Sequence, residues 1–306
     1  MESFKQEKIG EVPSNDFKAI KKEREAKIRE HEREKFGGDY SKKPENLKAF
    51  IEIGLSGIIE KLPSKIKAVQ LGGAGGRLAE SVKKILEGEG KNSDFSIVDV
   101  NKKFLEEAEK RGFGVFELNL VDKVPIERID LAIMRNVLHY NSIEDIKKIL
   151  RNIKDSLKPE GYFVNQVISG KDQYHVEFIN KILSKEALGR GTNYLTKGDY
   201  LKLCEEAGFD TKFAGDAPAG KWTLKEMFWR TYPKKAEAQG VEDLSVFSEK
   251  EKEEYFKKRD SYVEKCKGIL ESFSRGKNIE DIDFKGVETE IEFTGPIFVS
   301  QPKIKK

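Results

Sequence analysis

The sequence has few cysteines, no long apolar run and almost no net charge. Its two cysteines, Cys204 and Cys266, both fall in helical patterns, so we expect two buried free thiols rather than a disulfide framework or a structural zinc site. The three histidines show no metal-ligand spacing, and we expect no bound metal. No stretch reaches the roughly 18 apolar residues that cross a bilayer, and the N-terminus lacks a secretory pattern. We therefore expect a cytoplasmic protein without a membrane partner.

Charges of the two signs nearly cancel. Lys and Arg number 57 and Asp and Glu 54, which gives a net charge of +3. This balance provides no general attraction to nucleic acid, although local basic segments such as PKIKK keep that partner open as a minor option. We expect a small-molecule substrate as the partner. The sequence leaves the oligomeric state open, with a homodimer as one option.

Strand and helix patterns alternate from Lys67 onward. The strand patterns, in order, are AVQL, FSIVDV, GVFELNL, DLAIMRN, YFVNQVIS, FDTKFAG and VETEIEFTGPIFVS. Repeated strand–helix–strand units predict an α/β fold with a parallel sheet and helices on both faces. A turn at Pro159-Glu160-Gly161 is expected before the fifth strand. Thr196 and Asp199 predict a capping box at a helix start.

Three units are predicted along the chain. They are an N-terminal helical extension or cap (1–64), a core (65–222 and 285–306) and a helical insertion between the sixth and seventh strands (223–284). A charged helix at 16–36 is either a solvated arm or a flap over a site, and an apolar-striped helix at 45–61 must be docked. An aromatic group in the insertion is either the core of its own helices or a lid; its members are Trp222, Phe228, Trp229 and Tyr232.

A glycine-rich stretch, QLGGAGGR at 70–77, follows the first strand and precedes a helix. Glycines in such a turn let the backbone approach a ligand near a helix N-terminus. The phosphate-loop pattern fails because Arg77 and Leu78 follow Gly76. The dinucleotide fingerprint fails as well, because Leu78 stands where its last glycine belongs. A nucleotide-dependent oxidoreductase is therefore disfavoured.

Several segments in order resemble one family. QLGGAGGR, SIVDVN, FELNLVD, IDLAIMRNVLHY and LKPEGYF are similar to the first five strand ends of class I S-adenosylmethionine-dependent methyltransferases, in the small-molecule (type 11/25-like) branch. The resemblance covers roughly 66–215 and the last strand. It implies a Rossmann-like, doubly wound, seven-stranded and mostly parallel sheet with an antiparallel last strand, plus N-terminal helices and a helical insertion.

The resemblance also implies a cofactor, S-adenosylmethionine, and residues that contact it. Asp99 would accept hydrogen bonds from the ribose hydroxyls, which the chemistry of a strand-end carboxylate also favours, and Asn119 would meet the adenine amino group. An alternative for Asp99 is an N-cap of the next helix. The full set expected at the cofactor is Tyr40, Gln70, Gly72, Gly73, Gly75, Gly76, Asp99, Val100, Asn119, Leu120, Arg135 and Asn136. Gln70 departs from the acid usual at the end of the first strand, and Ala74 from the middle glycine.

The implied activity is methyl transfer to a small molecule by in-line displacement, which gives S-adenosylhomocysteine. If the acceptor must lose a proton, His139 is the best-placed candidate base, with a structural histidine as the alternative. Tyr174 and His175 follow the fifth strand and are further catalytic candidates that would face substrate. The competing hypothesis is a catalytically silent cofactor-binding or regulatory protein, which the departures at Gln70 and Ala74 favour.

Overall fold

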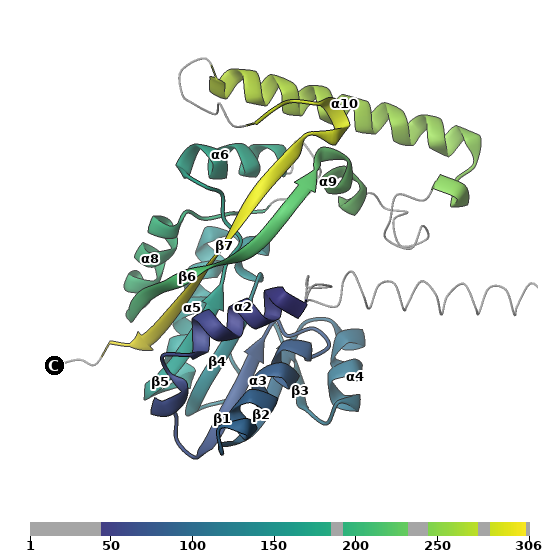
Figure 1. Ribbon diagram of the computed structural model, residues 1–306. Coiled ribbons are helices and arrows are strands. Elements are labelled where there is room, and N and C mark those ends of the chain that lie inside the picture. The colour runs from purple at the N-terminus through teal and green to yellow at the C-terminus, as the bar shows by residue number, and fades with distance from the viewer. Residues whose placement is uncertain (1–43, 185–191, 232–243, 275–281, 304–306) are drawn as a thin grey trace, which may run out of the picture.

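The centre of the protein is a seven-stranded sheet. The computed structural model describes residues 44–184, 192–231, 244–274 and 282–303 (Figure 1). The strands lie in the order β3-β2-β1-β4-β5-β7-β6, with bounds β1 (Lys65–Leu71), β2 (Asn92–Asp99), β3 (Gly114–Glu117), β4 (Ile129–Arg135), β5 (Leu157–Gln166), β6 (Phe209–Thr223) and β7 (Glu290–Pro302). β1 to β5 pair in parallel, whereas β7 runs antiparallel to β5 and β6. The predicted Rossmann-like topology is confirmed.

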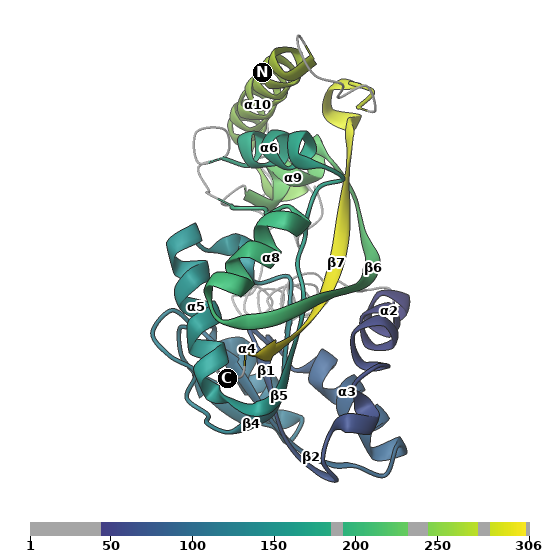
Figure 2. The same ribbon diagram turned by 90° about the vertical axis from the view of Figure 1, so that its left-hand side faces the viewer.

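Helices cover both faces of this sheet (Figure 2). One face is covered by α2 (Pro44–Leu55), α3 (Arg77–Gly88) and α4 (Lys102–Lys110), and the other by α5 (Ile143–Ser156) and α8 (Lys197–Glu206). Neighbouring residues of one strand therefore enter different cores: Ala68 packs on the α3 side and Val69 on the α5 side. Covering on both faces explains why β4, in the middle of the sheet, is buried at every position instead of alternating.

β6 and β7 continue past the sheet as a two-stranded arm (Figure 1). β5 pairs with β7 only through Phe163–Gln166, whereas β6 and β7 stay paired as far as Thr223 and Glu290. The far end of the arm packs with α6 (Gln173–Ile182), α9 (Leu224–Thr231), α10 (Glu249–Ser274) and the short helices η4 (Leu244–Val246) and η5 (Gly286–Glu288). These elements share a third hydrophobic cluster, separate from the two on the sheet. We call them the helical unit.

Local signals in the sequence are confirmed at several positions. The Thr196 hydroxyl accepts a hydrogen bond from the backbone N–H of Asp199, 3.0 Å away, at the start of α8. Cys204 and Cys266 are both buried and free. Within the part of the chain that is described, no helix has the length and apolarity to cross a membrane.

Two predictions of local structure are wrong, and a third concerns residues that the structure does not describe. The helix expected over 45–61 ends at Leu55, and a turn and η1 (Ile59–Lys61) follow, because Ser56 and Gly57 are poor helix formers. The turn expected at 159–161 lies inside β5 as an irregularity, since Ile129 pairs with Leu157 and Leu131 with Tyr162. A Cβ on Gly161 would lie 2.6 Å from the Ile129 carbonyl oxygen, so this close approach requires glycine. The helix expected at 16–36 lies outside the described residues.

Candidate cofactor site

A cavity of about 360 Å³ opens at the carboxyl ends of the parallel strands. This edge is where ligands bind in open α/β sheets, and the volume lies in the range of small-molecule sites. The cavity is lined by Gly72, Ala74, Val98, Asp99, Val100, Phe104, Leu118, Asn119, Leu120, Arg135, Asn136, Val137, Tyr140, Asn141 and Ile149. Seven of the expected cofactor residues are in this set: Gly72, Asp99, Val100, Asn119, Leu120, Arg135 and Asn136.

The glycine loop forms one wall of the cavity. Gly72 has a left-handed φ of 62°, and a Cβ there would lie 2.5 Å from the Val137 side chain. The backbone at Gly72 thus comes close to the residues that follow β4, and a larger residue at this position would prevent this approach. Ala74, which replaces the middle glycine, also has a positive φ of 42°. Gly73, Gly75 and Gly76 shape the loop but are not among the lining residues.

Asp99 connects the loop to β2. Its Oδ2 accepts a hydrogen bond from the backbone N–H of Ala74 (2.9 Å), and its Oδ1 accepts one from Asn101 (2.9 Å). A carboxylate has about four lone-pair positions, so acceptor capacity is left for a ligand. The alternative that Asp99 is the N-cap of α4 is wrong, because Asn101 caps this helix through the N–H of Lys103.

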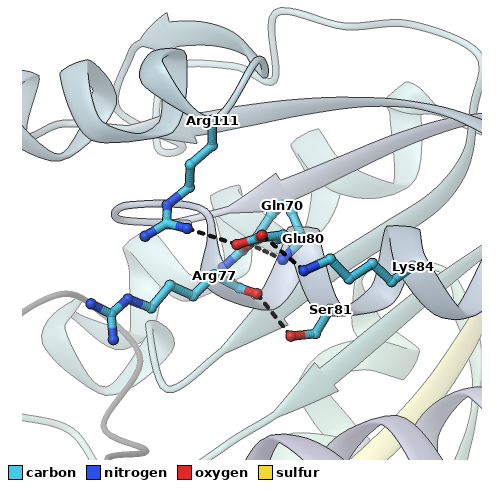
Figure 3. A network of polar contacts seen from close by, with 7 residues as sticks. Gln70, Arg77, Glu80, Ser81, Lys84 and Arg111 are labelled. Atoms are coloured by element: carbon cyan, nitrogen blue, oxygen red, sulfur yellow. Dashed lines mark hydrogen bonds and ion pairs between the residues drawn. The ribbon is translucent and has the colours of Figure 1, made fainter.

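Gln70 at the end of β1 does not line the cavity. Its side chain is buried, and its Oε1 accepts a hydrogen bond from the backbone N–H of Ala79 at 2.9 Å. The amide therefore holds the first turn of α3 against β1. On the outer side of this turn, Glu80 contacts Arg111 (2.7 Å) and Lys84 (3.0 Å), as Figure 3 shows. Gln70 supports the glycine loop from behind instead of presenting a group to a ligand.

The end of β4 contributes polar side chains to the cavity. Arg135 is 4% exposed, and its Nε donates to the Gln166 side-chain oxygen at the end of β5 (2.7 Å). Asn136 is 8% exposed and has a left-handed φ of 58°. Its side-chain oxygen is buried and has no hydrogen-bond partner in the described structure. Leaving a buried polar atom without a partner is costly, and this oxygen is an acceptor that a ligand in the cavity could satisfy.

The opposite end of the cavity is apolar. Val100, Phe104, Leu118 and Leu120 lie there, and the Val100 side chain is 64% exposed. Asn119 lies beside them, and its Oδ1 accepts a hydrogen bond from the backbone N–H of Val121 (3.0 Å). This bond leaves the Asn119 amide NH₂ and one lone pair of its Oδ1 for a ligand. An apolar slot with one amide suits a flat heterocycle.

His139 lies next to the cavity but does not line it. The imidazole stacks on Tyr194 with 5.0 Å between ring centres and contacts Tyr140 at 4.0 Å. Burial lowers its pKa from 6.5 to about 3, so the ring is neutral at pH 7. Its Nδ1 is buried without a partner among the described residues. This environment favours the structural alternative over a general base.

Tyr174 and His175 lie away from this cavity, in the first turn of α6. His175 lines a second, larger cavity of about 650 Å³ between α6 and the β6–β7 arm, among lysine and acidic side chains. Tyr40 and Tyr232 lie outside the described residues. Among the residues that can be described, no three His, Cys, Asp or Glu side chains cluster to hold a metal.

Two members of the aromatic group, Phe228 and Trp229, belong to the core of the helical unit, as the first of the two alternatives predicts. Phe228 and Trp229 are buried in the third cluster, where both contact the ring of Tyr255. Eight lining residues are absent from the predicted cofactor set: Ala74, Val98, Phe104, Leu118, Val137, Tyr140, Asn141 and Ile149. All but Ile149 lie at or shortly after the ends of β1 to β4, and this position is the signal that could have found them.

Part of the sheet matches a known protein family. Residues 69–163 match the family model described as methyltransferase domain, a span from β1 into β5 that is less than half of the 306-residue chain. This segment is therefore similar to methyltransferase domains. No curated protein matches the sequence significantly.

Solved structures share the fold at low sequence identity. The YcgJ protein from Bacillus subtilis is 14% identical with a TM-score of 0.56, over 85% of this chain and 99% of that one. A candidate methyltransferase from Bacillus halodurans C-125 is 14% identical with a TM-score of 0.57, over 84% and 99%. The phosphoethanolamine N-methyltransferase 2 of Haemonchus contortus, solved with S-adenosyl-L-methionine, is 14% identical with a TM-score of 0.50, over 96% and 61%. At this identity the likeness shows the fold alone.

Proposed function

We propose that the protein binds S-adenosylmethionine in the 360 Å³ cavity and transfers its methyl group to a small-molecule acceptor. One observation carries the proposal: Asp99, at the end of β2, faces the same cavity as the close-approach glycine Gly72. The family match over the same strands supports it. The unsatisfied oxygen of Asn136 and the apolar slot beside Asn119 also fit this cofactor.

Each residue has a definable task toward the cofactor. The Asp99 carboxylate accepts hydrogen bonds from vicinal hydroxyls, the apolar slot takes the adenine ring, and the Asn119 amide donates to a ring nitrogen. When bound, S-adenosylmethionine supplies a methyl group already activated by its sulfonium. The protein then has to position an acceptor and exclude water, which needs no covalent intermediate.

Proton removal from the acceptor does not fall to His139 in this proposal. Its pKa of about 3 makes the imidazole a weak base, and it does not line the cavity. An acceptor that is already deprotonated at neutral pH requires no base from the chain. The small-molecule class of acceptor rests on the family resemblance.

Calorimetric binding of S-adenosylmethionine, S-adenosylhomocysteine and NADH tests the proposal. We expect the first two to bind and Asp99→Asn to weaken them by about tenfold or more, since hydrogen bonds to a charged acceptor contribute about 1.5–3 kcal/mol. Asp94→Asn is the matched control, because Asp94 is an exposed residue of the same strand. It should leave both affinities unchanged.

The outcomes separate the competing functions. Binding of NADH alone would contradict a methyl-donor site. Cofactor binding without methyl transfer from a labelled donor in an acceptor screen would favour the silent, regulatory alternative. Loss of affinity in both Asp variants would show a general charge effect, not a hydrogen bond accepted by Asp99.

A further inference from the structure

The end of β1 has no side chain free for a charged cofactor group. Gln70 stands there, its side chain 3% exposed and hydrogen-bonded to the first turn of α3. It is not a lining residue. A zwitterionic amino-acid tail on a bound cofactor must therefore be recognised from another strand end.

The end of β4 provides both complementary groups. Leu71 pairs with Met134, so Arg135 follows at the level of Gly72. Among the described residues that line the cavity, Arg135 is the only cation and Asp99, at the end of β2, is the only acid. The bond from Nε to Gln166 orients the guanidinium by fixing one of its nitrogens.

Asn136 supplies an acceptor at the next position. Its oxygen is buried without a hydrogen bond in the described structure, and its side chain is more than nine-tenths buried. The residue is held at a φ of 58°, a conformation that asparagine tolerates better than most residues. The backbone N–H of Asn136 donates to the Gln166 carbonyl at 2.9 Å, which fixes this turn against β5.

We propose that Arg135 binds the carboxylate of the cofactor's amino-acid tail and that the Asn136 side-chain oxygen accepts a hydrogen bond from its ammonium group. The inference rests on the proposed function and adds how the tail is recognised. Arginine suits a carboxylate because its planar fork can donate two parallel hydrogen bonds. Recognition of the tail is thereby moved from the end of β1 to the end of β4.

Two probes that share the adenosine part isolate this contribution. S-adenosylhomocysteine carries the amino-acid tail, and 5′-methylthioadenosine lacks it. We expect Arg135→Met to weaken the first by about tenfold or more and the second by less than about twofold in calorimetry. Asn136→Gly, which keeps the backbone conformation, should weaken only S-adenosylhomocysteine, and Asn136→Asp should restore its binding.

Controls cover folding and general electrostatics. Arg135→Lys keeps the charge and should give a smaller loss of affinity, confined to S-adenosylhomocysteine. This variant tests the inference if Arg135→Met does not fold. Arg151→Met, on the exposed side of α5, and Gln70→Leu should leave the affinity ratio of the two probes unchanged. Equal losses for both probes in folded Arg135 variants, or an unchanged ratio, would overturn the inference. Failure of the wild type to bind either probe would instead count against the proposed function.

Discussion

At the scale of single residues, the glycine loop gives the sharpest steric prediction. Gly72→Ala should lower the free energy of unfolding by about 1–3 kcal/mol, because the new methyl group would lie 2.5 Å from Val137 at a positive φ. Chemical denaturation measures this change. Gly88→Ala is the control, since nothing lies within 4 Å of its added Cβ in α3. Equal stability of the two variants would contradict the close approach at Gly72.

His139 gives a prediction about pH. The folded protein keeps the imidazole neutral down to about pH 3, whereas the unfolded chain protonates it near 6.5. Its contribution is therefore fully present above pH 6.5 and is lost as the pH falls toward 3. His139→Phe should remove this dependence, so that the wild type loses stability relative to the variant by about 1 kcal/mol per pH unit on acidification. A difference between the two that is constant with pH would contradict the burial of a neutral imidazole.

At the scale of elements, an ion pair joins Glu80 of α3 to Arg111, the residue after α4. The hydrogen bond from Lys84, then the charge of Arg111, lowers the pKa of Glu80, so its contribution is present above the unfolded pKa and is lost as the pH falls through the folded one. Because the pairs are partly exposed, Glu80→Gln should cost less than about 1 kcal/mol at pH 7 and nothing in acid. Urea denaturation at both pH values measures this. Glu106→Gln, exposed on α4, should show no effect, and an equal cost for both variants would contradict a specific contact.

Elements with local signals were predictable from the sequence. Alternation of apolar runs and helical patterns defined the parallel sheet, and Thr196 marked the start of α8. The full length of β6 was not predictable from the sequence. Its pairing with β7 continues to Thr223 and crosses irregularities near Gly215 and Gly220, so its end depends on the partner strand. Residues distant in sequence likewise determine the environments of two predicted site residues, His139 and Gln70. The segment that holds Tyr194 buries His139, and the first turn of α3 engages Gln70.

At the scale of the whole molecule, the helical unit has its own core. Tyr255 is fully buried between Phe228 and Trp229, in the cluster that is separate from those on the sheet. Tyr255→Ala should therefore raise amide hydrogen exchange in α9 and α10 while β1, β4 and β5 keep their protection. Phe256→Ala, at an exposed neighbouring position, should change little. Faster exchange throughout the sheet in the Tyr255 variant would show that the molecule opens as one unit.

The central claim is that the cavity at the ends of β1, β2 and β4 holds the methyl donor. A crystal structure with S-adenosylhomocysteine tests it most directly. The account predicts that the ribose lies against Asp99, the adenine between Val100 and Leu120, and the tail toward Arg135. Density for the ligand in the 650 Å³ cavity beside α6, or at any site that leaves Asp99 without contact, would contradict it.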